Sequence, residues 1–421
     1  MINGDSFGFI YYSGVYDDKC GKVIASIEPQ IEYTLYKEGK VRVEGKGSED
    51  LVVIGDPFTD LVSLVRYRNR FGRGIPMLGF ISYESLTYSE HSLSNLIPQS
   101  EYPLASFVIP RVYAFADLCS GDAHLRSLYG GNIRIYAKRE TDRPREEDVE
   151  LLEVSHDKEA FKDLVIKAKE RIYDGEIFQV VLSRYKIYRY PGSPLELFKK
   201  IVREVDSNPS NPYAYIYKTQ DLVIVGASPE PLIIARGRIA ETFPVAGTRR
   251  RIPGRELEIY RRLVSNEKER AEHMMLVDLA RNDLGKVAIP GSVNIARLMF
   301  PQILPNVVHI VSRIRGVLKS FIDSFEALRS LFPAGTVTGA PKHRAMKLIA
   351  EFEGRARGPY AGVIGYTVDQ YMNFAITIRS AYINDDRLRI QAGAGIVSDS
   401  RPDDEYLETE NKMAIIERII R

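Results

Sequence analysis

Apolar residues in the second half of the chain follow two different spacings. Between residues 161 and 173 they recur every three or four positions, which places Phe161, Leu164 and Ala168 on one face of a predicted helix. The same spacing predicts three further helices, at 255–284, 340–351 and 403–420. Short apolar or alternating runs predict strands, and they lie at 179–188, 213–217, 222–226, 232–235, 307–317, 361–368, 374–383 and 388–393.

The pattern also divides the chain into two regions. Residues 138–150 are charged, contain Pro144 and lack apolar periodicity, so we expect an exposed linker there. Segments before it, such as 32–44 and 79–83, predict a β-rich N-terminal region. After it, helices and strands follow one another without regular βαβ alternation and without an internal repeat. This order favours an α+β fold with a large antiparallel sheet system. In the last helix we expect three residues in the core, Leu407, Ile416 and Ile420.

The composition indicates a globular protein in a reducing compartment. The 421 residues are 44% hydrophobic and 27% charged, with a net charge of +2, so neither a nucleic acid nor a membrane is expected as a partner. Cys20 and Cys119 lack CxxC spacing, which argues against a structural zinc site. The N-terminus lacks a signal-peptide pattern, and no apolar run reaches the roughly 20 residues of a membrane span. We therefore expect a cytoplasmic protein.

Four glutamates are the first candidates for chemistry. Glu269 and Glu272 lie in NEKERAEHMMLVDLARNDLG, and Glu405 and Glu408 lie in DEYLETENK. Each pair is spaced i, i+3, so both carboxylates of a pair share one face of a helix. If the two helices face each other, the carboxylates need a cation, and oxygen ligands without His or Cys favour Mg²⁺. Ordinary salt bridges on two solvated helices explain the same spacing, and spacing alone does not decide between the two.

Three glycine-rich turns are expected at 244–250, 333–342 and 391–397, with the sequences PVAGTRR, PAGTVTGAPK and QAGAGIV. Glycine lets backbone N–H groups approach an anion closely. None has the spacing of a P-loop or of a Rossmann turn, and singly each is more often a plain turn. Together with nearby polar residues they favour an anion site. These polar residues are Thr248, Thr336, Arg379 and Lys412.

Two more side chains are candidates for catalysis. Glu230 lies between two prolines in GASPEP, so its carboxyl is rigidly presented, which suits a fixed acid. A turn glutamate exposed to water is the alternative, and GASPEP is not the GxSxG elbow of a serine hydrolase. His309 lies in the predicted strand VVHIVS, where a lone histidine is more often a hydrogen-bonded structural residue than a catalytic one.

Taken together, the motifs resemble those of a known family. In chain order they are GEIFQVVLS, NPYAYIY, GASPEP, PVAGTRR, NEKERAEHMMLVDLARNDLG, VVHIVS, PAGTVTGAPK, GPYAGVIGY, TIRS, QAGAGIVSDS and ETENK. This collinear series resembles the chorismate-utilising enzymes, most closely the large subunit of anthranilate synthase. The resemblance covers roughly residues 158–412, and the N-terminal third matches chiefly through GFISYE at 79–84.

The resemblance implies a large antiparallel β-sandwich with surrounding helices, in a two-domain composite of a regulatory region (1–150) and a catalytic region (151–421). It implies an active site for chorismate and Mg²⁺, with Glu272 and Glu408 as metal ligands supported by Glu269 and Glu405. The residues implied to be catalytic are Glu230, His309 and Thr336. Those implied to bind substrate are Gly247, Thr248, Tyr360, Arg379, Gly393, Ala394, Gly395 and Lys412.

The implied reaction converts chorismate to anthranilate, the first step of tryptophan biosynthesis. Ammonia adds at C2 as the C4 hydroxyl leaves, with Glu230 as the candidate proton donor, and pyruvate is then eliminated. Gln179 stands where water-adding relatives carry a lysine base, and Ala246 stands where aminodeoxychorismate synthases commonly carry a nucleophilic lysine. The second reading, an aminodeoxychorismate synthase, is therefore disfavoured. A non-catalytic paralogue is disfavoured because the metal carboxylates and Arg379 are present; Asn373, often Asp in relatives, is interpreted as a tolerated neighbour of the site.

The source of ammonia is expected to be a second chain. Neither Cys20 nor Cys119 lies in the nucleophile elbow of a glutamine amidotransferase, so the resemblance implies a separate small subunit that hydrolyses glutamine, in a hetero-oligomer. It also implies feedback inhibition by tryptophan, at a site that includes Asn208, Pro209 and Tyr213. That segment carries one extra residue relative to the family pattern, and the LLES-like segment that completes the site is not evident.

Overall fold

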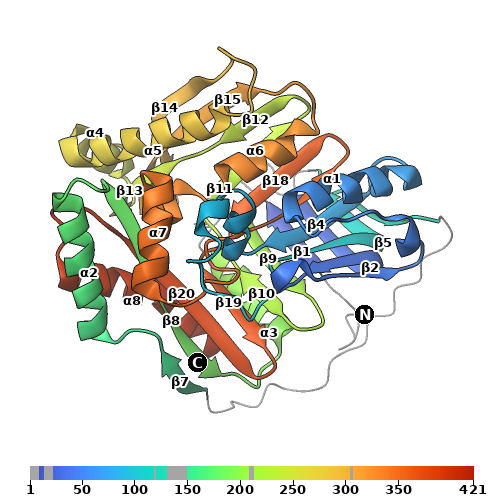
Figure 1. Ribbon diagram of the computed structural model, residues 1–421, viewed down its shortest axis with the longest axis horizontal. Helices are drawn as coiled ribbons and strands as arrows, with labels where there is room; N and C mark the ends of the chain where they lie inside the picture. The colour runs from blue at the N-terminus through green and yellow to red at the C-terminus, as the bar shows by residue number, and fades with distance from the viewer. Residues whose placement is uncertain (1–8, 14–21, 118–119, 130–148, 208–212, 304–306) are drawn as a thin grey trace.

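One network of antiparallel strands runs through the molecule (Figure 1). The computed structural model describes residues 9–13, 22–117, 120–129, 149–207, 213–303 and 307–421. From one end, neighbouring strands are β14 (Asn294–Ile303), β15 (Val307–Val317), β12 (Ile239–Thr242), β11 (Pro231–Arg236), β18 (Tyr371–Ile376), β17 (Val363–Val368), β4 (Pro76–Ile81), β5 (Ala105–Asp117), β2 (Lys22–Leu35), β1 (Phe9–Ser13), β9 (Tyr213–Lys218), β10 (Val223–Gly226), β19 (Ser380–Asn384), β20 (Arg387–Ile396) and β8 (Gln179–Arg189).

Shorter strands branch from this path. β13 (Val245–Arg250) pairs with β15, β3 (Val41–Gly45) with β2, and β6 (Ala123–Ser127) with β5; β7 (Glu150–Val154) and β16 (Gly339–Ala340) pair with β8. The sheet curls, so that β13 and β15 from one end and β8 and β20 from the other line one cavity. The predicted α+β class with a large antiparallel sheet is confirmed.

The N-terminal strands lie in the middle of the path. β4 pairs with β17, and β1 pairs with β9, so strands from residues 9–117 join the two halves of the sheet contributed by the rest of the chain. The division into regions at residue 150 stays a prediction. Most of the expected linker, together with Cys20 and Cys119, lies outside the described residues.

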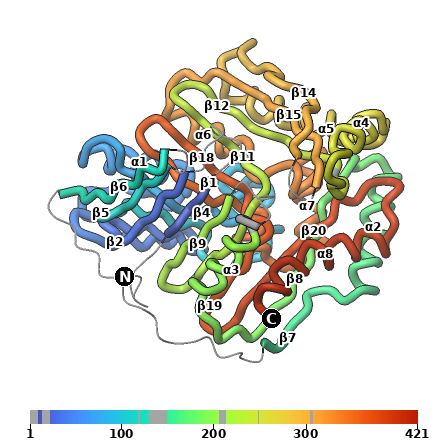
Figure 2. The backbone as a smooth tube through the Cα atoms, turned by 180° about the vertical axis from the view of Figure 1, so that it is seen from behind, coloured from blue at the N-terminus to red at the C-terminus, as the bar shows by residue number. Residues whose placement is uncertain are grey.

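Helices cover the outside of the curled sheet. They are α1 (Pro57–Arg68), α2 (Lys158–Tyr173), α3 (Pro194–Ser207), α4 (Glu256–Ser265), α5 (Glu267–Gly285), α6 (Asp323–Leu331), α7 (Lys342–Glu353) and α8 (Pro402–Ile420), with 3₁₀ turns at Lys37–Gly39, Ser48–Asp50, Asn69–Phe71, Tyr83–Tyr88, His91–Leu93 and Gly335–Val337. α4 and α5 pack against β13 and β15, whereas α8 packs against β20 and α2. Figure 2 shows α8 and α2 from behind, on the side where the chain ends.

The predicted helix at 255–284 is in fact two helices. Asn266 ends α4, and its side chain accepts a hydrogen bond from the backbone N–H of Glu269 at 3.0 Å, so it caps α5. Asparagine is a strong N-cap because its oxygen satisfies one of the free N–H groups of the first turn. The apolar period runs across this break, so period alone could not reveal it. The cap sets the residue at which α5 begins, and with it the helical positions of Glu269 and Glu272.

Two other predictions on the C-terminal part are wrong. The expected strand at 374–383 is broken into β18 and β19, because Arg379 adopts φ of 54°, in the left-handed region. Leu407 is 56% exposed, whereas Ile416 and Ile420 are buried as predicted. α1, α3, α6 and β14 had no counterpart among the predicted elements.

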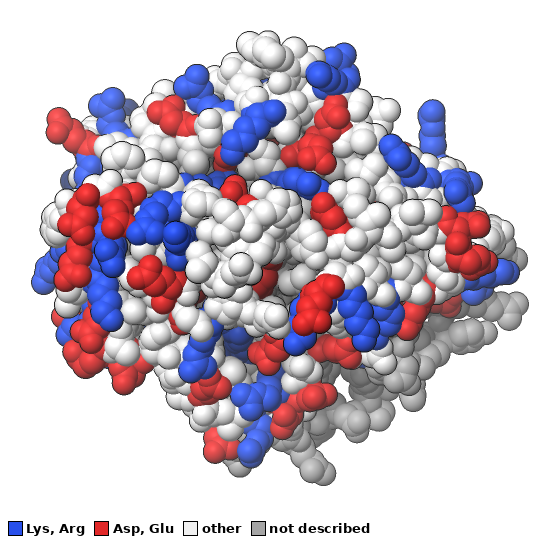
Figure 3. Space-filling view, in the orientation of Figure 1, with Lys and Arg blue, Asp and Glu red and all other residues white. Residues whose placement is uncertain are grey.

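The outer surface mixes both charges. Figure 3 shows lysine and arginine interspersed with aspartate and glutamate over one face of the molecule, in keeping with a net charge of +2. Among the helices of the described ranges, none combines the length and apolarity needed to cross a membrane.

Candidate active site

A cavity of about 920 Å³ opens between the two ends of the sheet and the helices α5 and α8. An inner pocket of about 200 Å³ continues from it and shares part of its wall, including His309, Thr336 and Arg379. Of the predicted catalytic and substrate-binding residues whose side chains the structure describes, all but Ala394 line one or both spaces. Segments far apart in the sequence are thus brought together around one site.

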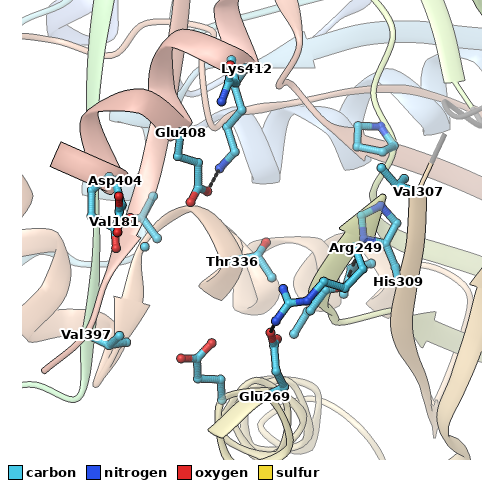
Figure 4. A pocket seen from close by; sticks show the side chains of 18 of the residues that line it. Val181, Arg249, Glu269, Val307, His309, Thr336, Val397, Asp404, Glu408 and Lys412 are labelled. Carbon is cyan, nitrogen blue, oxygen red and sulfur yellow. Dashed lines mark hydrogen bonds and ion pairs between the residues drawn. The ribbon is translucent and has the colours of Figure 1, made fainter. Parts of the chain in front are cut away.

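The four predicted metal carboxylates all line the outer cavity. Glu269 pairs with Arg249, with 2.7 Å between Oε1 and Nη2, and Glu408 pairs with Lys412, with 2.6 Å between Oε1 and Nζ. The first ion pair joins α5 to β13, and both members of the second lie on α8 (Figure 4). Among the side chains that the structure describes, no three acidic, histidine or cysteine groups stand close enough together to hold a metal ion as they are placed.

The electrostatics of these carboxylates nevertheless suit a cation. Burial raises the pKa of Glu272, and the charges of Glu269 and Glu408 raise it further, while Lys268 opposes them. Burial likewise raises the pKa of Glu405, and the charge of Glu408 adds to it. Partly buried carboxylates that repel one another across a cavity are relieved by a divalent ion, and an all-oxygen donor set matches Mg²⁺. The donor chemistry therefore fits the predicted metal, with Glu272 and Glu405 joined by Glu269 and Glu408.

The inner pocket holds a carboxyl group that keeps a proton near neutral pH. Glu230 is 9% exposed and accepts a hydrogen bond from Thr336 Oγ1 at 2.7 Å. Burial raises its pKa to about 7, although the bond from Thr336 and the charge of Lys412 act in the opposite direction. A carboxyl group with such a pKa is matched to proton donation at neutral pH. The expectation of a fixed acid is thus favoured over an exposed turn glutamate.

His309 also lines the inner pocket, and its imidazole lacks the second proton that would give it a charge. Its Nδ1 is 3.4 Å from the backbone oxygen of Gly247, and burial lowers its pKa to about 4. The nearby charge of Arg379 lowers the pKa further. His309 is therefore neutral at physiological pH and can offer a hydrogen bond without carrying a charge.

Two cationic side chains, Lys412 and Arg379, also line the inner pocket. Lys412 Nζ donates a hydrogen bond to the backbone oxygen of Gly393 at 2.7 Å, and Arg379 Nη1 lies 3.4 Å from the backbone oxygen of Lys412. The left-handed backbone of Arg379 costs free energy at a non-glycine residue, and its carbonyl is held by the N–H of Ala227 at 3.2 Å. The ring of Tyr360 closes this wall; burial raises the pKa of its phenol and keeps it neutral.

The glycines leave room rather than make turns. The segment 391–397, expected as a turn, lies mostly in the straight strand β20, and 244–250 lies mostly in β13 with a bulge at Gly247. A Cβ on Gly393 would come 2.8 Å from Tyr360 Oη, and one on Gly395 would come 2.7 Å from Gln179 Nε2. Ala394 faces the other side of the strand and packs in the hydrophobic core. The side chain of Thr248 lies outside what the structure describes.

The remaining predicted residues are placed as follows. Gln179 and Ala246 line the outer cavity. Asn373 lines neither space, and its amide donates to Tyr371 Oη at 3.1 Å. Tyr213 is buried in β9 and also lines neither space, while Asn208 and Pro209 lie outside the described residues.

Sequence reasoning missed three basic residues of the outer cavity, Arg249, Lys268 and Arg418. Arg249 pairs with Glu269, and Lys268 lies 2.8 Å from Asp399 and 3.9 Å from Glu272. Arg249 and Lys268 lie within motifs already quoted, but a basic residue beside an acidic one is so common on helices and strands that no spacing marked them.

Comparison with known proteins agrees with this geometry. The profile of the chorismate binding enzymes matches residues 16–418. The chain belongs to this family of chorismate-binding enzymes. Within it, the chain is similar to anthranilate synthase component 1 of Saccharolobus solfataricus, with 41% identity over 353 residues that cover 82% of this chain and 80% of that protein.

Two other relatives extend the match. Anthranilate synthase component 1 of Archaeoglobus fulgidus is 37% identical over 428 residues, covering 100% of this chain and 96% of that protein. The crystal structure of anthranilate synthase component I from Streptococcus pneumoniae superposes with a TM-score of 0.80 at 30% identity, covering 95% of this chain and 92% of that one. The predicted fold and family are thus confirmed.

Proposed function

We propose that the chain is the chorismate-converting component of an anthranilate synthase. The observation that carries this proposal is the inner pocket, where Glu230, whose pKa burial raises to about 7 and which accepts a hydrogen bond from Thr336, lines the same space as the cations Arg379 and Lys412. Chorismate carries two carboxylates and a hydroxyl that must leave with a proton. A pocket with cations at one wall and a buried acid at another offers a partner for each.

Arg379 and Lys412 bind one substrate carboxylate, because a guanidinium fork and an ammonium suit that group. Tyr360 and the bare backbone of Gly393 and Gly395 let the substrate lie close to β20. The second carboxylate points toward the outer cavity and Gly247. The ring then lies between Glu230 and His309, which orients its C4 hydroxyl toward the acid.

Glu230 donates its proton to the departing C4 hydroxyl as ammonia adds at C2. His309 does not compete for this role, since with a pKa of about 4 it carries no spare proton at neutral pH. Glu230 then holds the negative charge beside Lys412, whose cation stabilises the carboxylate until it is protonated again. Pyruvate is then eliminated: the proton at C2 is lost, the bond from C3 to the enolpyruvyl oxygen breaks, and the released enolpyruvate takes up a proton at its methylene carbon as the ring aromatises.

The outer carboxylates would supply the binding site for Mg²⁺, with Glu272 and Glu408 as ligands and Glu269 and Glu405 supporting them directly or through water. Mg²⁺ would supply a fixed positive charge that attracts and orients a substrate carboxylate.

Two side chains on the wall of the outer cavity favour the addition of ammonia at C2 over the addition of water and over covalent attack at C2 by a lysine. Gln179 is an amide and cannot deprotonate water, and Ala246 has no nucleophile that could attack C2. Ammonia would reach the chain from a glutamine amidotransferase small subunit in a hetero-oligomer. Cytoplasmic location, inhibition by tryptophan near Tyr213, and a regulatory role for residues 1–150 belong to the same proposal.

The proposal is tested by incubating the isolated chain with chorismate, Mg²⁺ and an ammonium salt at alkaline pH, and separating the products. Fluorescent anthranilate together with pyruvate is the expected result. Aminodeoxychorismate would contradict the weight placed on Ala246, and an absence of any product in the presence of bound chorismate would refute the activity itself.

A further inference from the structure

A buried ion pair lies directly behind the inner pocket. Arg357 follows α7 and is 1% exposed, and its guanidinium donates two hydrogen bonds to Glu353, at 2.9 Å from Nε and 2.6 Å from Nη2. The remaining donors reach two backbone oxygens, those of Val337 and Val181, both at 2.8 Å. Neither Arg357 nor Glu353 lines the pocket itself.

Both backbone partners of Arg357 belong to walls of the inner pocket. Val337 follows Thr336, the residue that holds Glu230, and Val181 is the residue of β8 that lines both spaces. The guanidinium also lies 5.7 Å from the ring centre of Tyr360 and 4.7 Å from that of Tyr83. The guanidinium of Arg357 thus contacts the loop that carries Thr336, the strand β8 and the ring of Tyr360, which closes the substrate wall.

Glu353 extends this arrangement to β20. Its Oε1 accepts hydrogen bonds from the backbone N–H of Ser183 at 2.7 Å and from Ser183 Oγ at 2.9 Å. Ser183 Oγ in turn accepts from Gln391 Nε2 at 2.7 Å, and Gln391 lines the inner pocket. The pair is therefore hydrogen-bonded, directly or through one residue, to the loop of Val337 and to the strands β8 and β20, all of which line the pocket.

A glutamate from the N-terminal region holds the backbone at Arg357. Glu84, from the segment GFISYE, accepts hydrogen bonds from the backbone N–H groups of Arg357 at 2.7 Å and of Gly358 at 3.1 Å. Glu84 is itself buried. The loop that runs from Arg357 to Tyr360 is thus held at its start by a residue from another part of the sheet.

Stability alone does not explain why an ion pair occupies this position. Removing two charges from water is costly, and apolar residues of similar volume are often as stabilising as a buried pair. What apolar residues cannot do is bond to Val337, Val181 and Ser183 at once. The directional bonds therefore point to positioning rather than to packing.

We infer that Glu353 and Arg357 are positioning residues, which hold Thr336, Tyr360 and Gln391 in the arrangement that binds chorismate. The expected loss of turnover rests on the proposed function, whereas the expected loss of chorismate affinity is tested independently of it. Neither residue touches the substrate. A misplacement of reacting groups by about 1 Å can cost about 100-fold in rate, so loss of the pair should damage binding and turnover more than folding.

The test uses the double variant Glu353→Leu/Arg357→Met, which leaves no unpaired charge buried, together with Arg357→Ala. Arg68→Met is the matched control, because Arg68 is also 1% exposed and bonds to the backbone oxygen of Thr367 at 3.0 Å, but lines neither space. Chorismate affinity is measured by calorimetry without ammonia, turnover with ammonium and Mg²⁺, and melting temperature for each variant. Arg357→Ala is assayed again with added guanidinium chloride against sodium chloride of equal ionic strength.

The expected result is a rise of about tenfold or more in the Kd for chorismate and a fall of about 100-fold in kcat for the double variant. The control Arg68→Met should show the wild-type Kd and kcat at temperatures at which it is folded. Added guanidinium should restore part of the chorismate affinity of Arg357→Ala. Folded variants with wild-type Kd and kcat would overturn the inference, as would a control that loses both equally. If the wild type binds chorismate but forms no anthranilate, the proposed function fails, and the Kd comparison still decides the inference.

Discussion

Replacing Glu230 with glutamine tests the proton donor most directly. The substitution keeps the shape of the side chain and leaves an oxygen for the hydrogen bond from Thr336, now 2.7 Å from Glu230 Oε1. It removes only the acidic proton. Loss of a general acid typically lowers turnover by about 10²- to 10⁴-fold, and we expect kcat with ammonium to fall within this range.

The same variant should gain stability at high pH. Burial raises the pKa of Glu230 from 4.5 to about 7, so the folded protein binds this proton more tightly than the unfolded chain. The wild type is therefore stabilised below pH 4.5 and loses that stabilisation as the pH rises through 7. At about 1.4 kcal/mol per pKa unit the loss is about 3 kcal/mol, most of it between about pH 5 and pH 8. Glutamine does not titrate and avoids this loss.

The assay compares thermal unfolding of both proteins at pH 5 and pH 8, and measures turnover as a function of free ammonia. Glu32→Gln is the matched control: Glu32 is 4% exposed, burial raises its pKa to about 7, and it lines neither space. It should show the same gain in stability at pH 8 with unchanged turnover. Wild-type turnover in Glu230→Gln would refute the role of acid, and loss of turnover without a relative gain in stability at pH 8 would refute the raised pKa.

Three further predictions concern the walls of the site. Glu272→Gln and Glu408→Gln should each weaken Mg²⁺ binding, measured by calorimetry, and lower turnover by about 10-fold or more; unchanged Mg²⁺ dependence in both would remove them from the metal site. Arg379→Ala should raise the KM for chorismate by about 10- to 100-fold, since a charged hydrogen bond is worth about 1.5–3 kcal/mol, and normal kinetics would exclude it from substrate binding. Gly393→Ala should raise the KM sharply and also lower the melting temperature, because its Cβ would come 2.8 Å from Tyr360 Oη and 3.0 Å from the backbone oxygen of Leu182; an unaltered KM would mean that the substrate does not lie along β20.

Much of the fold was predictable where the signal is local. The strand predicted at 307–317 coincides with β15, and the helix predicted at 403–420 differs from α8 by one residue. The i, i+3 spacing of the glutamates correctly put two carboxylates of each pair on the cavity side of α5 and α8. These predictions succeeded for the same reason: the period of a helix or strand can be recognised from a few consecutive residues.

What was not predictable depends on single residues or on distant partners. The break at Asn266 needs one side chain to bond one N–H group, and the bend at Arg379 needs one residue to take φ of 54°. The pairing of β4 with β17 joins residues far apart in the chain. The roles of Glu353 and Arg357 were invisible for the same reason, because a charged pair at i, i+4 on a helix end is ordinary until its burial and its bonds to Val337 and Val181 are known.

The position of the N-terminal strands gives the site its shape. The two walls of the cavity come from opposite ends of one sheet, and β4, β5, β2 and β1 are the strands between its two halves. Without them β17 and β9 would each expose an unpaired edge, and no hydrogen bonds along this path would hold one wall at a fixed distance from the other. Glu84 shows the same dependence on a smaller scale, since it fixes the loop of Arg357 behind the pocket. A ligand that shifts the N-terminal strands would therefore move the substrate walls relative to each other, which gives a regulatory role for residues 1–150 a mechanical route to the site.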